Sequence, residues 1–280
     1  MIERIYIPTI RRADIQYTYD DLPPELQKKV VMVVESGERE LYKYPCEYLE
    51  LPEDIVGAHT QLSQTRKFIH SHAGTIKYAM IDDDLILNKR NRKYFNHEPD
   101  MEKSKRKATP DEILRIFTQA SEWLDEESIG IVGLTDGMLP PPKEEYSDTK
   151  GVFGYLFFDG NKIAPLVKDI DTSIRVAEDL MFLFECLSRG VNTRVSNEFI
   201  YSNKSTTSDL RGKRPIWEGI QDETTKDVFQ LKEHYDALRY IQKRFPVGLT
   251  IFEEDGIMKN VKHWSKIYRS RITSSLENFI

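Results

Sequence analysis

Three consecutive aspartates, Asp82, Asp83 and Asp84, follow the apolar run YAMI and precede the run LIL. Neighbouring carboxylates repel one another unless a cation compensates their charge. Mg²⁺ and Mn²⁺ prefer such oxygen ligands, and they are typically held by one or two carboxylates together with substrate phosphates. Side chains alternate along a strand, so we expect Asp82 and Asp84 to point the same way and Asp83 the other way. This spacing predicts a pair of carboxylates for one metal-bound diphosphate.

The elements around the aspartates predict where the cluster lies. Strands are expected at 4–10, 30–35, 47–53 and 75–82, and a helix at 57–73. Such alternation favours a mostly parallel sheet with helices on both faces, and in these sheets ligands bind beyond the carboxyl ends of the strands. Because the aspartates end the fourth strand, they are expected at a ligand site. The alternative interpretation is a solvated strand end with capping aspartates.

The later part of the chain continues the pattern. A helix is expected after the N-cap Thr109 and Pro110, and a second helix is expected to end at Gly190. The last 75 residues are expected to be mainly helical. The remaining elements are predicted strands at 129–135, 151–160 and 193–203.

Composition limits the class of protein. The 280 residues are 39% hydrophobic and 31% charged, which is ordinary for a globular protein with a hydrophobic core. The net charge of −6 argues against a wholly basic nucleic-acid coat. Cys46 and Cys186 lack the spacing of a zinc site or a disulfide framework, so a cytoplasmic setting is expected. We find no signal peptide and no run of roughly 18 apolar residues, and therefore expect no membrane association.

Four segments together resemble the glycosyltransferases of the GT-A fold. They are IYIPTIRR at the start, QTRKFI in the helix at 57–73, IDDDL after the fourth strand, and AED at the start of the helix that ends at Gly190. The resemblance covers roughly residues 4 to 205. It implies a Rossmann-like α/β sheet, the transfer of a hexose from a nucleotide sugar, and a Mn²⁺ or Mg²⁺ ion.

The resemblance implies roles for residues around the donor. Asp82 and Asp84 would match the D-x-D pair, which touches the metal and the ribose–diphosphate of a nucleotide sugar. Thr9, Arg11 and Arg12 would lie against the nucleotide at the end of the first strand.

Further residues complete the site that the resemblance implies. Arg66 would point from its helix to the diphosphate, which suits bidentate contact with a guanidinium. Glu178 and Asp179 would match the x-E-D element, where a carboxylate of inverting enzymes withdraws the proton of the acceptor hydroxyl; helix N-terminal charge is the alternative. Asp83 would bond a neighbouring loop or the donor sugar. Many such enzymes add a histidine ligand, but the matching strand reads FIYSNKS, which leaves Lys204 as a candidate diphosphate contact and the third metal ligand open.

A narrower resemblance concerns the acceptor. The start YIPTIRR, the run MIDDDL and the compact size are similar to the TET/JBP-associated glycosyltransferases, a phage-type family that modifies hydroxymethylated pyrimidines such as 5-hydroxymethylcytosine in DNA. It implies UDP-glucose as donor, DNA as partner and, for a bacteriophage protein, the host cytoplasm as location. The segments 88–107 and 203–215 are basic and flank the expected site, so they are candidates for phosphate contacts. Solvated loops are the alternative.

Other function classes stay open. An enzyme of this fold could act on a glycan, a lipid-linked or a protein acceptor, and a non-catalytic protein could bind a nucleotide sugar without turnover. A nucleotidyltransferase usually needs a glycine-rich phosphate loop, and IPTIRRAD contains no glycine. We expect a GT-A catalytic domain at 1–205 and a helical C-terminal extension at 206–280 packed on it.

Overall fold

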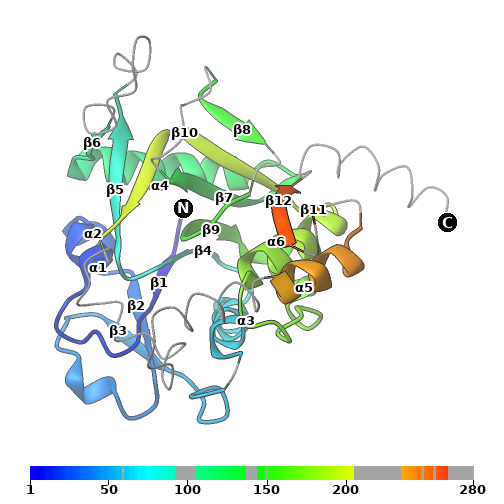
Figure 1. Ribbon diagram of the computed structural model, residues 1–280. Coiled ribbons are helices and arrows are strands. Elements are labelled where there is room, and N and C mark those ends of the chain that lie inside the picture. Colours follow the sequence, from blue (N-terminus) through cyan, green and yellow to red (C-terminus); the bar gives the residue numbers. More distant parts are fainter. Residues whose placement is uncertain are drawn as a thin grey trace.

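One large sheet forms the centre of the protein (Figure 1). The computed structural model describes residues 1–58, 60–91, 105–136, 144–148, 151–204, 235–246, 249–254 and 257–263. Over these residues the sheet has ten strands: β1 (Arg4–Pro8), β2 (Val30–Val34), β3 (Glu47–Glu50), β4 (Lys77–Ile81), β5 (Leu85–Arg90), β6 (Lys105–Lys107), β7 (Ile129–Asp136), β8 (Tyr146–Asp148), β9 (Tyr155–Asp159) and β10 (Asn192–Asn203).

The strand directions are mixed. Neighbouring strands follow the order β3-β2-β1-β4-β9-β7-β10-β5-β6, with β8 paired to β10. β3, β2, β1 and β4 are parallel to one another, whereas β9 is antiparallel to both of its neighbours. β7 and β10 are again parallel and run in the same direction as β4. The predicted α/β class with a mixed, mostly parallel sheet is therefore confirmed.

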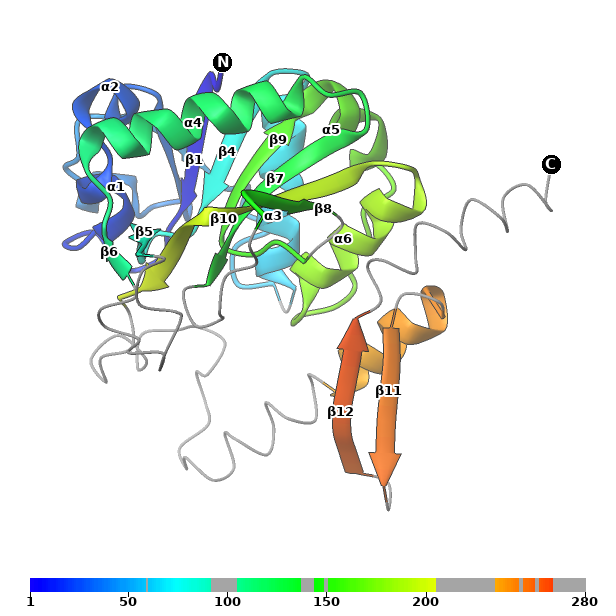
Figure 2. The same ribbon diagram turned by 90° about the horizontal axis from the view of Figure 1, so that it is seen from above.

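Helices cover both faces of the sheet (Figure 2). One face carries α3 (Gln61–Ala73), α5 (Gly160–Val167) and α6 (Glu178–Ser188), which enclose the first core. The other face carries α1 (Tyr17–Asp21), α2 (Pro24–Gln27) and α4 (Pro110–Leu124), which enclose the second core. Strand side chains alternate between the two, so that Tyr6 of β1 belongs to the first core and Ile5 and Ile7 to the second.

Helix boundaries follow local signals. Thr109 and Glu112 form a reciprocal capping box at the start of α4, and Pro110 occupies the first turn, as the sequence predicts. Gly190 follows α6 with a φ of 80°, a conformation that suits a residue without a side chain. None of the described helices combines the length and the hydropathy that crossing a bilayer requires.

The basic segment at 88–107 forms strands where it is described. β5 pairs antiparallel with both β6 and β10. Leu85 and Leu87 of β5 lie in the second core, and Ile86 between them does not belong to it. These strands were not predicted, because the lysines and arginines that follow Leu87 conceal the alternation in the sequence.

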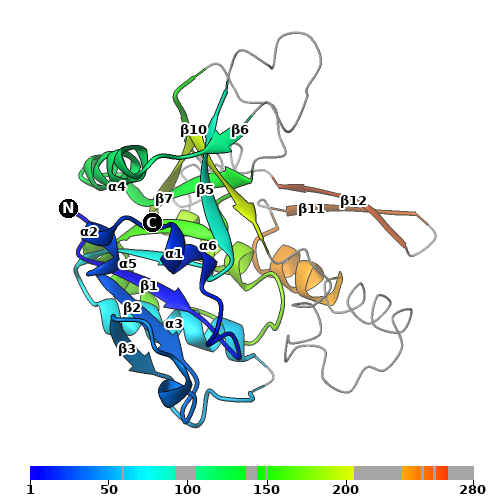
Figure 3. The same ribbon diagram turned by 90° about the vertical axis from the view of Figure 1, so that its left-hand side faces the viewer.

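The C-terminal part combines a helical segment with a hairpin. Residues 235–244 are helical, and Phe245 at their end packs against Phe184 of α6. β11 (Leu249–Glu254) and β12 (Ile257–His263) form an antiparallel pair that stands apart from the large sheet (Figure 3). The hairpin differs from the mainly helical extension that was expected. The Asp-Gly pair between its strands is a typical sequence signal for such a turn.

Candidate functional site

A cavity of about 400 Å³ lies at the carboxyl ends of β1 and β2. Thr9 reaches it from the end of β1, Glu35 from the end of β2, and the aspartates from the end of β4. These ends meet at one edge of the sheet, so residues far apart in the sequence converge there. The polar residues that line the cavity are Thr9, Arg12, Glu35, Gln61, Thr65, Arg66, Asp82, Asp83, Asp84 and Asn203.

Arg12 neutralises two of the aspartates. Its Nη1 atom lies 2.5 Å from Oδ1 of Asp83 and 3.2 Å from Oδ2 of Asp84. Thr9 donates a hydrogen bond of 2.7 Å to the other oxygen of Asp83, and Gln16 donates to Thr9 at 2.8 Å. A guanidinium between two carboxylates compensates their repulsion. The chain after β1 therefore holds the aspartates in place.

The three aspartates do not alternate as expected for a strand. β4 ends one residue before Asp82, and Asp83 and Asp84 lie in a turn before β5. Side chains of a turn need not alternate, and Asp83 and Asp84 share Arg12, while Asp82 faces Arg66. The interpretation that Asp82 and Asp84 point together and Asp83 points away is therefore wrong for this structure.

We call residues 82–84 the aspartate turn. Arg66 connects this turn with the start of α6. Its Nη2 atom lies 3.5 Å from Oδ1 of Asp82, and its Nε atom lies 3.3 Å from Oε1 of Glu178. Burial lowers the pKa of Arg66, but the charges of Asp82, Glu178 and Asp179 raise it further, so the guanidinium stays charged. The side chain of Arg66 therefore connects the D-x-D element with the x-E-D element.

Two buried carboxyl groups have raised pKa values. Burial raises the pKa of Asp83 to about 6, against the opposing effects of Arg12 and Thr9. Burial also raises the pKa of Glu178 to about 7, although Arg66 lowers it. In both cases the loss of hydration of the charged form outweighs the partner. Carboxyl groups with raised pKa values gather at functional sites more often than elsewhere.

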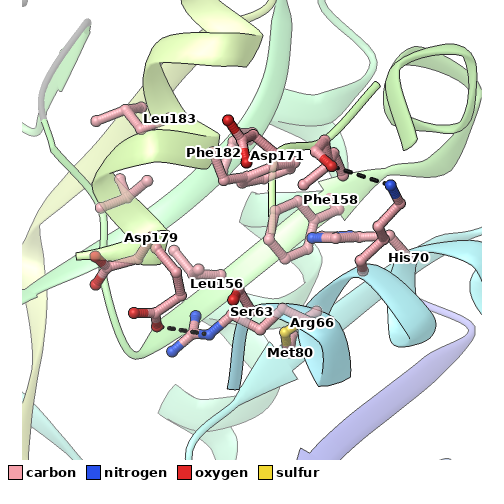
Figure 4. A pocket seen from close by; sticks show the side chains of 15 residues that line it. Ser63, Arg66, His70, Met80, Leu156, Phe158, Asp171, Asp179, Phe182 and Leu183 are labelled. Atoms are coloured by element: carbon pink, nitrogen blue, oxygen red, sulfur yellow. Dashed lines mark hydrogen bonds and ion pairs between the residues drawn. The ribbon is translucent and has the colours of Figure 1, made fainter. Parts of the chain in front are cut away.

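A smaller cavity, of about 20 Å³, lies on the α6 side of Arg66 (Figure 4). Arg66 and Asp179 border it together with the apolar rings of Phe158 and Phe182. Its volume is about that of one water molecule. Asp179 is half-buried in the first turn of α6, and its Oδ1 atom accepts a hydrogen bond of 2.7 Å from the amide of Leu180. Because Arg66 lines both cavities, it separates the aspartate turn from Asp179.

Arg11 and Lys204 were expected to contact the donor, but neither lines the larger cavity. Arg11 has a left-handed backbone with a φ of 54°, its amide donates to Glu38 at 3.1 Å, and its side chain is exposed. Lys204 is also exposed, and its amide donates to the carbonyl of Asp84 at 2.8 Å. Lys204 therefore ties the end of β10 to the aspartate turn through its backbone, and the neighbouring Asn203 lines the cavity.

Glu35 and Gln61 line the cavity and were not predicted. Nε2 of Gln61 donates to Oε1 of Glu35 at 2.5 Å, and the amide of Gly57 donates to Oε1 of Gln61 at 2.8 Å. The sequence holds a signal for Glu35, which directly follows the buried run VVMVV and therefore ends a strand. Gln61 carries no such signal, because only the packing of α3 brings it to β2.

Some of the basic residues expected to meet a nucleic acid are paired within the protein. Lys89 and Arg106 both pair with Glu112, at 3.0 and 2.6 Å, and Lys107 pairs with Asp21 at 2.7 Å. These cations are thus partly neutralised. The remaining parts of the two basic segments lie outside the described residues: 92–104 and 205–215.

The aspartate turn suits a divalent cation that also binds phosphate. Asp82 has a side chain that is 38% exposed, and it lines the cavity with Asp84. In the part of the chain that the structure describes, no three His, Cys, Asp or Glu side chains converge on one point. Mg²⁺ keeps several waters and needs only one or two carboxylates besides phosphate oxygens. An ion bound by Asp82 and Asp84 would thus need a diphosphate to complete its coordination, and this pair of ligands stays a prediction.

A cavity at the carboxyl ends of parallel strands, bordered by a D-x-D element that Arg66 connects to an x-E-D element, is the arrangement expected of a glycosyltransferase. Residues 3–212 match the family model of the TET-associated glycosyltransferases. This match covers most of the chain, so the protein belongs to that family and is a nucleotide-sugar glycosyltransferase. A comparison with curated proteins finds no match.

Two solved structures show a distant likeness. Residues 1–349 of TarS from S. aureus are 12% identical with a TM-score of 0.45, over 87% of this chain and 73% of that chain. A putative glucose-1-phosphate thymidylyltransferase from Bacillus anthracis is 11% identical with a TM-score of 0.41, over 78% of this chain and 96% of that chain. Likenesses this low indicate neither a shared substrate nor a shared acceptor.

Proposed function

We propose that the protein transfers glucose from UDP-glucose to the hydroxymethyl group of a modified pyrimidine in DNA, with Mn²⁺ or Mg²⁺ as cofactor. The observation that carries this proposal is the cavity of about 400 Å³. At its charged end Asp82 pairs with Arg66, and Arg66 also pairs with Glu178. Its volume is in the range of cavities that hold small-molecule ligands. Membership of the glycosyltransferase family supports the same activity.

Sheet order suggests how the donor lies. β1 separates β2 from β4, so Glu35 and the aspartate turn lie on opposite sides of Thr9. Arg66, together with a cation that the aspartate turn would hold, would supply the positive charge that a diphosphate needs. Glu35 and Gln61 supply a carboxylate and an amide, which hydrogen-bond hydroxyl and N–H groups of a nucleoside. The diphosphate is therefore assigned to the β4 side and the nucleoside to the β2 side.

Asp179 is the proposed general base. The acceptor hydroxyl gives its proton to Asp179 while its oxygen bonds to C1 of the hexose, and the bond between C1 and the diphosphate oxygen breaks. The diphosphate leaves with the electron pair and is met by Arg66, which Glu178 holds at 3.3 Å. A cation held by Asp82 and Asp84 supplies further positive charge to the diphosphate when it is bound.

The first test concerns the metal. Asp84→Asn removes a carboxylate charge without changing the size of the side chain, and we expect transfer to fall about 100-fold or more. Asp54→Asn, an exposed aspartate elsewhere, is the matched control and should retain wild-type activity. Circular dichroism checks that both variants fold. Full activity of Asp84→Asn in the presence of EDTA contradicts the metal role.

The acceptor is tested by mass spectrometry of nucleosides. The protein is incubated with Mn²⁺, a panel of UDP-sugars, and DNA that contains or lacks 5-hydroxymethylpyrimidine. We expect one added hexose on hydroxymethylated DNA only, and none with EDTA. Nucleotide binding without turnover of any donor would instead indicate a non-catalytic nucleotide-sugar-binding protein.

DNA binding through the segment 88–107 is tested by salt dependence. Arg92→Glu with Lys93→Glu should weaken DNA binding and lower the salt slope by about 0.9 for each DNA phosphate that the variant no longer neutralises. Lys28→Glu with Lys243→Glu changes the net charge equally at exposed residues elsewhere and serves as control. Arg90 is unsuitable, since it is 6% exposed and its reversal would disturb the fold. If both double variants have the same salt slope, the segment 88–107 does not contact the DNA phosphates.

A second acceptor class is favoured by the paired cations. Lys89, Arg106 and Lys107 already meet carboxylates of the protein, which leaves less positive charge for a DNA backbone. A hydroxyl of a glycan, a lipid-linked or a protein acceptor requires no such charge. Transfer to these acceptors, with no salt-sensitive DNA binding, is the result expected for this candidate.

A further inference from the structure

The segment 168–177 joins α5 to Glu178 at the start of α6, and we call it the α6-entry loop. It contains neither helix nor strand. It ends at Ala177, whose φ of 59° and ψ of 27° lie in the left-handed region. This conformation is strained for a residue with a β-carbon, and it persists only where surrounding contacts enforce it. The strain lies directly before Glu178 and Asp179.

Side chains of α3 hold the main chain of this loop. The hydroxyl of Ser63 donates to the carbonyl of Ile174 at 2.9 Å. The ammonium of Lys67 donates to the carbonyl of Ile170 at 3.0 Å. Because α3 also carries Arg66, one helix fixes both the loop and the guanidinium that faces Glu178.

Asp171 anchors the loop on a second side. Its Oδ1 atom accepts the amide of Ser173 at 2.8 Å, which closes a turn within the loop. Its Oδ2 atom accepts from the hydroxyl of Tyr240 at 2.7 Å and from Nη1 of Arg244 at 3.1 Å. Arg244 also pairs with Glu185 in α6. One guanidinium thus bridges the loop and the helix that follows it.

The segment that presents these donors is itself packed in the first core. Ile241 and Phe245 are buried, and the ring of Phe245 lies 5.7 Å from that of Phe184 in α6. Close packing keeps the donors at a fixed distance from the loop. Asp171 also borders the small cavity that Asp179 lines, so its position affects the space beside the proposed base (Figure 4).

From these contacts we infer that Tyr240 and Arg244 are positioning residues for the transfer reaction. Through Asp171 they hold the α6-entry loop in the strained path that directs Asp179 to the acceptor. The inference rests on the proposed function, since it assumes that Asp179 acts as the base. Both residues lie beyond residue 212, where the family match ends, so a part of the chain outside the match contributes to the site.

Steady-state kinetics test the inference with Tyr240→Phe and Arg244→Met. We expect kcat to fall about tenfold or more, because a displacement of about 1 Å at a reacting group is enough for such a loss. KM for the nucleotide sugar should stay within about twofold, since the donor cavity is built from other elements. Arg244→Lys, which keeps the charge, should recover part of kcat. Lys243→Met, at an exposed neighbour, is the matched control and should leave both constants unchanged.

Hydrogen exchange of the loop amides is a readout that needs no activity. The amide of Ser173, bonded to Asp171, should exchange faster in Tyr240→Phe and Arg244→Met than in Lys243→Met. Unchanged exchange overturns the anchoring, whatever the activity. Unchanged kcat, or a rise in KM that accounts for the whole loss, overturns the positioning role. Lack of transfer by the wild-type protein with any acceptor overturns the proposed function, and the exchange data then still decide whether the loop is anchored.

Discussion

Arg66 forms ion pairs with Asp82 and Glu178, and Arg12 forms ion pairs with the other two aspartates of the turn. Arg12 donates hydrogen bonds to both of its carboxylates, whereas Arg66 forms ion pairs at 3.5 and 3.3 Å with its two. In each case one guanidinium compensates the charge of two carboxylates. Removal of one partner from such a buried set leaves an uncompensated charge and is strongly destabilising. Substitutions in this site therefore need a folding control beside every activity measurement.

His70 is a buried polar residue behind the site. Its Nδ1 atom is hydrogen-bonded to the hydroxyl of Tyr78, and its ring stacks on that of Phe182 in α6 with centroids 4.5 Å apart. Burial, with a smaller contribution from the charge of Arg66, lowers the pKa of His70 to about 3. The pKa of an unfolded histidine is about 6.5, so below that pH the unfolded chain binds a proton that the folded protein excludes.

We expect this histidine to weaken the fold as the pH falls from about 6.5 towards 3, by at most about 1.4 kcal/mol per pH unit. His70→Gln should be less stable at neutral pH, but its stability should depend less on pH. Urea unfolding at about pH 7.5, 6 and 5 measures both effects. His72→Gln replaces an exposed imidazole of the same helix by an amide that can still pair with the hydroxyl of Tyr6, and it is the control. Equal pH slopes for the wild type and His70→Gln contradict the prediction.

At the scale of elements, a glycine allows β9 and α5 to approach the end of α3. A β-carbon on Gly160 would lie 2.3 Å from the carbonyl oxygen of Ile76 and 2.5 Å from that of Gly74. Both neighbours are backbone atoms, which cannot move aside as a flexible side chain can. Since α5 leads into the α6-entry loop, this close approach also sets where the loop begins.

Gly160→Ala should therefore destabilise the protein by about 3 kcal/mol or more, at the upper end of the usual cost of overpacking. Gly190→Ala is the matched control. A β-carbon there meets nothing within 4 Å, and only its φ of 80° opposes the substitution. The control should lose about 1–2 kcal/mol. Chemical denaturation measures the free energy of unfolding of both, and equal losses contradict the argument.

At the scale of the whole molecule, the hydrophobic core includes residues that lie beyond the end of the family match. The match ends at residue 212, whereas Leu238, Ile241 and Phe245 belong to the first core beside α6. Burial of one large apolar side chain contributes roughly 1.5–3 kcal/mol, and a typical protein is stable by only about 5–15 kcal/mol in total. These three side chains therefore contribute a large part of the free energy of unfolding.

A chain that stops at residue 212 should lose cooperative unfolding, because the first core would be open to water. A chain that stops at residue 248 keeps the packed segment and should unfold cooperatively. Near-ultraviolet circular dichroism during thermal unfolding distinguishes the two, and size-exclusion chromatography detects aggregation. Equal melting temperatures for the two truncated chains contradict the structural role of the segment.

Features that depend on neighbouring residues were readable from the sequence. The N-cap Thr109, the strands from β1 to β4 and the place of the aspartates after an apolar run all follow from spacing within a few residues. The strand β5 was missed because charged residues hide its alternation. The hairpin was missed although its Asp-Gly pair is a local signal.

The arrangement of charges depended on folding. The turn at Asp83 and Asp84 overrides strand alternation, Gln61 meets Glu35 from another element, and Tyr240 reaches Asp171 across the sequence. Partners so far apart in the chain meet only when the sheet and its helices have packed. The sequence by itself therefore determined the aspartates and arginines of the site, and the tertiary structure added Glu35 and Gln61 and decided which groups share a partner.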